Sequence, residues 1–207
     1  MNKTQARFVT LWSRCGIIDA DAVCDRLVRP FAEPARLYHT LRHIRRCLRD
    51  LDWTRSAIPH PDAVELALWC HDVIYVPGVP GASDHAQRSV YWFLHWAQGR
   101  IAESERVADM NLATTHTVVP DNPDARFTAD IDLADLGSDR ACFVRDEANL
   151  RAERPDLDDT TYDRRVHAFL SALLVREHIY HTHVFRARCE ARARSNLAWR
   201  LAQLAAG

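Results

Sequence analysis

The stretch PDAVELALWCHDVIY, residues 61–75, decides the fold class and contains the first candidate site. Pro61 suits the first turn of a helix, and the apolar residues after it recur at helical spacing on the same stripe as His71. The imidazole of His71 is therefore expected to face the interior. Asp72 follows directly, and a carboxylate at the inner end of an apolar helix is costly unless it is paired or bound to a metal.

Helical spacing of apolar residues continues outward in both directions, whereas the long alternating runs typical of strands are missing. Segments 76–83 and 118–124 are expected to be loops, and neither is long enough to link two domains. The sequence therefore predicts one all-α domain over residues 1–207. Its expected helices cover residues 4–14, 19–30, 38–52, 61–74, 84–98, 103–117, 126–136, 139–152, 160–178 and 182–205.

Composition narrows the classes of partner. The 207 residues are 47% hydrophobic, enough for a core, and 27 basic against 28 acidic residues leave a formal charge of −1. No nucleic-acid polymer is therefore expected as a partner. Six cysteines form no CxxC pair, the N-terminus lacks the apolar run of a signal peptide, and no stretch is long enough to cross a membrane. We expect a reduced, cytoplasmic protein with no membrane partner.

Two histidines stand one helix away from His71. His39 and His43, in YHTLRHI, are four residues apart and share a helix face beside an apolar stripe. A lone inward histidine is usually a core residue with a hydrogen-bond partner. Two histidines next to a His-Asp pair favour a metal site instead.

A third segment, FTADIDLADLG at residues 127–137, offers the carboxylate that such a site needs. Asp135 fits the polar face of an amphipathic helix, which leaves Asp130 and Asp132 as candidates. Two imidazoles and two carboxylates suit one divalent transition metal, Mn, Fe, Co, Ni or Zn, and Mg more weakly.

The order His…His-Asp…Asp resembles the HD superfamily, and most closely a small bacterial group described as predicted metal-dependent HD phosphohydrolases. YHTLRHI, ELALWCHDVIY, the SD of GASD, ATTH, DIDLADLG and REHIYHTHVFRARCEARARSNL carry the resemblance. It implies an HD-domain helical bundle with additional C-terminal helices, with a metal-site core at about 36–140 and an extension at about 141–207. It also implies hydrolysis of a small phosphate ester or anhydride, with a nucleotide as the expected substrate.

A more distant resemblance assigns roles within the site. Cyclic-nucleotide phosphodiesterases carry YHNxxHA, whose second histidine binds metal and whose first protonates the leaving group. By this likeness His43 is a ligand and His39 the general acid. The same enzymes have their last ligand aspartate before Leu-Ser, which Asp132 before Leu133 resembles, so Asp132 is preferred to Asp130. The implied ligands are His43, His71, Asp72 and Asp132. Asp72 or Asp132 would also orient the attacking water.

Further residues are candidates for contacting substrate. Arg42 stands among Arg36, Arg45, Arg46 and Arg49, which form either a solvated helix face or a phosphate-attracting group. His116 is either a helix-end residue near a turn or a residue that contacts the substrate or supports a metal ligand. Asp84 is either a helix N-cap or an acid facing the metal, although the related group more often has Asp-Asn-Glu where this chain has Asp-His-Ala. His178, His181 and His183 resemble a second ligand set without an inward carboxylate, and a helix junction is preferred for them.

Departures from named relatives leave two rival functions. The acidic residues that follow the His-Asp pair in alarmone hydrolases and deoxynucleotide phosphatases are missing, as is the Gly-Tyr-Pro of cyclic-di-GMP hydrolases. One rival is therefore a non-catalytic regulatory module that binds a nucleotide or a metal. The other is a di-iron oxygenase, which needs more ligands than the chain offers. The amphipathic tail 184–204 could pack on its own domain or on a second copy in a homodimer.

Overall fold

The computed structural model describes residues 1–78 and 84–206, and within these ranges the chain is helical and has no strand. The predicted all-α class is confirmed. Residues 79–83 of the predicted loop 76–83 lie outside the described residues. The α-helices are α1 Lys3–Arg14, α2 Ala20–Val28, α3 Leu41–Thr54, α4 Pro61–Cys70, α5 His85–Ala97, α6 Ser104–Ala113, α7 Pro123–Asp132, α8 Arg140–Ala152, α9 Asp159–Leu174 and α10 His183–Ala206. Three short 3-10 helices are η1 Pro30–Ala32, η2 Arg55–Ala57 and η3 Leu133–Gly137.

Local capping explains two boundaries that matter for the site. The helix predicted from residue 38 begins at Leu41, because the side chain of Thr40 accepts a hydrogen bond from the backbone N–H of Arg42. Pro61 occupies the first turn of α4, as expected, but that helix ends at Cys70. His71 and Asp72 therefore lie in the turn that follows it, not on its last turn.

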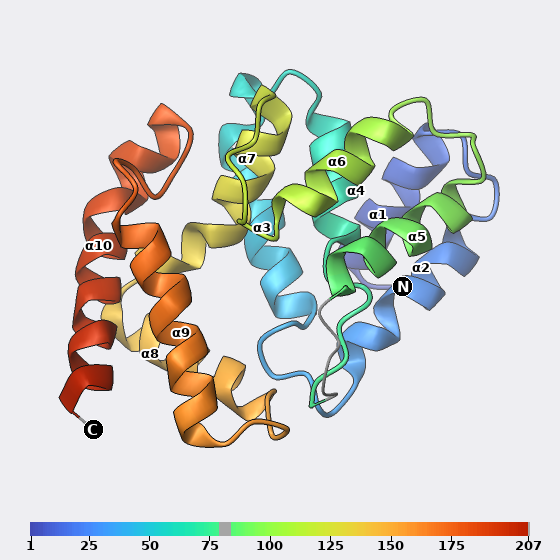
Figure 1. Cartoon of the computed structure of the whole chain (residues 1–207). Coiled ribbons are helices and arrows are strands. Elements are labelled where there is room, and N and C mark those ends of the chain that lie inside the picture. Colours follow the sequence, from blue (N-terminus) through green and yellow to red (C-terminus); the bar gives the residue numbers. More distant parts are fainter. Residues whose placement is uncertain (79–83, 207) are drawn as a thin grey trace.

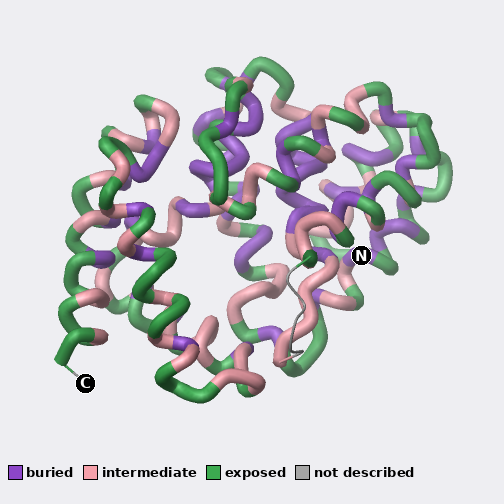
Figure 2. The backbone as a smooth tube through the Cα atoms, viewed as in Figure 1, coloured by how far each residue is buried: buried purple, intermediate pink, exposed green. Residues whose placement is uncertain are grey.

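Helix α4 is the centre of the larger half of the molecule. Every residue from Ala63 to Cys70 is buried, and α1, α3, α6 and α7 pack around it (Figures 1 and 2). Aromatic rings fill the contact with α1, where Phe8 stacks on Trp12 at 5.0 Å and meets Trp69 edge-on at 5.3 Å. Each such buried side chain contributes about 1.5–3 kcal/mol. The core that fixes the site thus begins well before residue 36.

Helices α8, α9 and α10 gather on the other side of α3 and α7 (Figure 1). Helix α10 packs on η3 and on α9. The contact with η3 is close, since a Cβ built on Gly137 would lie 2.7 Å from the Cβ of Cys189. Asn196 donates to the carbonyls of Leu136 and Ser138. None of the described helices combines the length and the apolar content needed to cross a bilayer.

Candidate metal centre

Three elements bring nitrogen and oxygen donors to one point. His43 comes from α3, His71 from the turn after α4, and Asp132 from the last residue of α7; one donor atom from each lies within 4.8 Å of the other two. His43 Nε2 is 3.2 Å from His71 Nε2 and 3.1 Å from Asp132 Oδ1. Asp72 stands beside this group of three, with Oδ2 2.9 Å from His71 Nε2 and 3.6 Å from His43 Nε2. These are the four residues predicted as ligands.

A hydrogen bond at Nδ1 of His71 orients the imidazole so that Nε2 faces the cluster. Its Nδ1 lies 3.0 Å from the carbonyl oxygen of Leu68, so Nδ1 carries the proton and donates it. The lone pair on Nε2 is then free for the cluster. This arrangement, with a backbone carbonyl behind the ring, is the usual support of a metal-bound histidine.

The electrostatics of the cluster also suit a cation. Burial lowers the pKa of His71, but Asp72 and Asp132 outweigh it and hold that pKa well above its ordinary value. The pKa of Asp132 is correspondingly held well below its ordinary value, against the opposing effect of burial, by His71 and by hydrogen bonds from the other imidazoles. Two partly buried carboxylates thus require positive charge beside them. A divalent cation could supply that charge in place of the imidazole protons.

His39 is held by Glu153, a residue that no sequence motif indicated. Glu153, at the end of α8 and fully buried, places Oε2 2.5 Å from His39 Nδ1. Its other oxygen accepts the backbone N–H groups of Leu37, Tyr38 and His39 at 2.6, 2.8 and 3.0 Å. We call this arrangement the Glu153 clasp. The ring of Tyr75 stacks on His39 at 3.9 Å, so the imidazole is fixed from a second direction.

His116 contacts the cluster from behind Asp132. Its Nε2 lies 2.9 Å from Asp132 Oδ2, while the other oxygen of Asp132 faces His43 and His71. Its φ of 57° lies in the left-handed region, which residues other than glycine adopt in only a few per cent of cases. His116 thus follows the end of α6, as one interpretation of the sequence expects, and its imidazole also contacts a candidate ligand.

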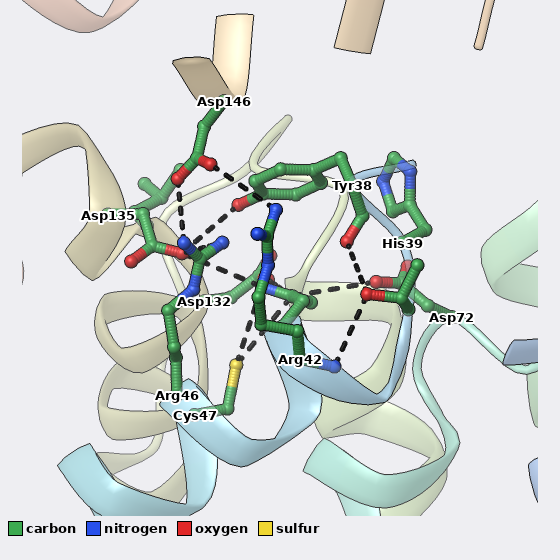
Figure 3. A network of polar contacts seen from close by, with 12 residues as sticks. Tyr38, His39, Arg42, Arg46, Cys47, Asp72, Asp132, Asp135 and Asp146 are labelled. Carbon is green, nitrogen blue, oxygen red and sulfur yellow. Dashed lines mark hydrogen bonds and ion pairs between the residues drawn. The ribbon is translucent and has the colours of Figure 1, made fainter. Parts of the chain in front are cut away.

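Asp135 was expected on the polar face of an amphipathic helix. It lies instead in the cavity lining, with its carboxylate near His43. Its Oδ2 accepts from the hydroxyl of Tyr38 at 3.4 Å and pairs with Arg46 at 2.8 Å (Figure 3). Arg46 also pairs with Asp146 at 2.7 Å. The reason is that α7 passes into η3 at residue 133, which turns Asp135 toward α3.

The remaining candidates lie farther out. Arg42 is half exposed and reaches Asp146 only at 3.9 Å. Asp84 occupies the N-cap position of α5 but is exposed, and its side chain makes no capping hydrogen bond. Asp130 faces away from the cluster and accepts the backbone N–H groups of His181 and Thr182, both at 2.7 Å. Histidines 178, 181 and 183 form no second ligand group within the described residues.

A cavity of about 220 Å³ opens onto the cluster. Its polar wall includes His39, Asp72, His116 and Asp132, so the candidate acid and the candidate ligands share one space. Its apolar lining is formed by Leu133, Leu136, Phe143, Leu150 and Phe169. Comparison of the chain with protein-family models, with curated proteins and with solved structures gives no match in any of the three.

Proposed function

We propose that this chain is a metal-dependent phosphohydrolase of the HD type, acting on a small phosphate ester or anhydride. The observation that carries the proposal is the convergence of His43, His71 and Asp132, with Asp72 beside them, in a cavity that also contains His39. The resemblance in YHTLRHI, WCHD and DIDLADLG supports the same assignment. A single group of three donors among the described residues favours one metal over two.

The donor set fits a divalent transition metal. Two imidazole nitrogens and two carboxylates suit Mn, Fe, Co, Ni or Zn better than Mg, which prefers oxygen and keeps its waters. Such a metal would supply Lewis acidity toward a phosphoryl oxygen and a water molecule. Asp72, with its side chain partly open to the cavity, would help to hold the metal and orient the attacking water.

His39 is suited to give a proton to the leaving oxygen. Its Nδ1 is engaged by the Glu153 carboxylate, which orients the ring and leaves Nε2 for the cavity. A positioned acid of this kind contributes about 10²–10⁴ in rate. The apolar wall formed by Leu136, Leu150 and Phe169 offers space for an uncharged part of the substrate, such as a nucleoside base. Arg42, half exposed and 3.9 Å from the cavity residue Asp146, is our candidate to meet a phosphate, since Arg46 is bound to two carboxylates.

The test is metal analysis of the purified chain, followed by turnover of a panel of nucleotides and phosphoesters. We expect one divalent metal per chain and turnover that is lost in His71→Ala and Asp132→Ala. His167→Ala, an exposed histidine on α9, is the matched control and should keep both properties. Turnover that survives in both ligand variants would overturn the proposal. A tightly held metal with no product in any reaction would favour the regulatory module instead.

A further inference from the structure

A second pocket has a volume of about 310 Å³, and one of its lining residues, Arg176, donates to the backbone carbonyl of His116. Three arginines line it: Arg126 on α7, Arg176 after α9 and Arg186 in the first turns of α10. His178 and His181, from the segment between α9 and α10, complete its basic lining. We call it the arginine pocket. It shares no lining residue with the cavity at the metal centre.

Backbone carbonyls fix the three guanidinium groups without neutralising them. Arg126 Nε donates to the carbonyl of Pro120 at 2.9 Å, and Arg176 Nη2 donates to that of His116 at 2.7 Å. Arg186 donates to the carbonyls of residues 180 and 181 at 2.9 and 2.6 Å. Within the ranges that the structure describes, none of the three has a carboxylate within 4.0 Å, whereas Arg194 on the same helix pairs with a glutamate at 2.7 Å. The side chains are thus held in place with unbalanced charge.

Two features of the pocket residues reflect this unbalanced positive charge. Arg176 Nη1 is buried and has no hydrogen-bond partner among the described residues. Burial, together with the neighbouring cations Arg176 and Arg126, lowers the pKa of His181 to about 4. A buried N–H of a cation without an acceptor is costly, and the charge that Arg176 leaves unbalanced favours an anion near it.

The acids nearby offset this charge only in part, since Asp130 attracts Arg186 without pairing with it. Glu177 lines the pocket, but its side chain is 92% exposed and extends into solvent. Asp130 is buried behind the segment, and its oxygens are taken up by the two backbone N–H groups of residues 181 and 182 and by the hydroxyl of Thr182. Neither carboxylate is paired with an arginine of the pocket.

We propose that the arginine pocket binds a small phosphate-bearing anion, at a site separate from the metal centre. Planar guanidinium groups with spare N–H donors are the side chains best matched to phosphate oxygens. Binding here does not depend on hydrolysis, because the residues differ from those of the cavity at the metal centre. Arg176 joins the two places, since its Nη2 holds the carbonyl of His116, whose imidazole contacts Asp132.

The experiment uses the full chain treated with a chelator, so that the acidic metal cluster cannot retain an anion through a metal. Binding of pyrophosphate, of inorganic phosphate and of glycerol phosphate is measured by calorimetry at constant ionic strength. We expect saturable binding that weakens about tenfold in Arg126→Gln and in Arg186→Gln, because each loses a charge-assisted hydrogen bond. Arg192→Gln, an exposed arginine on the same helix as Arg186, should bind like the wild type. The arm that binds tightest identifies a free phosphate or an esterified one as the ligand.

A second measurement locates the anion in the unaltered chain. In a ¹H–¹⁵N spectrum, pyrophosphate should shift the amide signals of residues 176–182 and leave those of residues 71 and 72 unchanged. The proposal fails if the shifts appear at the metal cluster instead, or if both arginine variants bind as tightly as the wild type. It also fails if chloride at the same ionic strength has the same effect as pyrophosphate.

Discussion

Replacing Glu153 with alanine removes the acceptor of the Glu153 clasp, and the cost can be worked out from the structure. One carboxylate oxygen serves the three backbone N–H groups of residues 37–39, and the other serves His39 Nδ1. A buried donor left without a partner costs about 1–3 kcal/mol. Leu37 is 42% exposed, so water can reach part of this segment. We expect Glu153→Ala to lower the free energy of unfolding by about 3–5 kcal/mol.

Glu153→Gln separates charge from hydrogen bonding. The amide oxygen can still accept the three N–H groups, so we expect a loss of only about 1–2 kcal/mol. Burial opposes ionisation of Glu153, but hydrogen bonds from His39 and the backbone outweigh it and lower its pKa. A depressed folded-state pKa contributes stability above the ordinary carboxyl pKa, and this contribution is lost as the pH falls below it. The difference between wild type and Glu153→Gln should therefore shrink on acidification.

Denaturant unfolding at neutral pH and at pH about 4 measures both effects. Glu105→Ala, which truncates an exposed glutamate on α6, is the control and should change stability by less than about 0.5 kcal/mol. If Glu153→Ala costs no more than this control, the clasp contributes nothing to folding. In that case the assignment of Glu153 as the residue that positions His39 is wrong.

Three further results are expected. Asp132→Asn should weaken Zn²⁺ or Mn²⁺ binding in a competitive chelator titration at least about tenfold, whereas Asp130→Asn, which alters a carboxylate outside the cluster, should destabilise the fold and leave metal affinity intact. Because the folded pKa of His181 is lowered to about 4, the chain binds fewer protons than its unfolded form between that value and about 6.5. The wild type should therefore lose more stability than His181→Gln between pH 7 and 5 in denaturant unfolding. Gly137→Ala should lower the free energy of unfolding by about 1–3 kcal/mol in the same assay, since the new methyl group would meet Cys189 at 2.7 Å.

The local pattern of the sequence predicted the helices well. Each of the ten expected helical segments overlaps one of the α-helices that the structure describes. Two errors in the predicted bounds affect the site. Thr40 caps α3 three residues later than expected, and α4 ends before His71. Neither change could be read from apolar spacing, because both depend on one capping contact or one turn.

The candidate site was predictable to the extent that its residues share short motifs. His43 and His71 are close because their helices pack against each other, and the apolar stripes indicated those faces. Asp130 and Asp132 could not be separated by spacing alone, and only the packing of α7 turns Asp132 to the cluster and Asp130 to the start of α10. Glu153 had no signal at all, since it stands 114 residues from His39.

The Glu153 clasp has a consequence for how this polypeptide can be divided. A fragment that stops near residue 140 would include the whole group of candidate ligands and most of the apolar core, and it would be the natural choice for a minimal catalytic piece. It would nevertheless lack the Glu153 carboxylate, which accepts the backbone N–H groups of residues 37–39. The helices after residue 140 are thus part of the machinery that keeps His39 in place, and a cut between α8 and η3 should release that histidine while leaving the candidate ligands together.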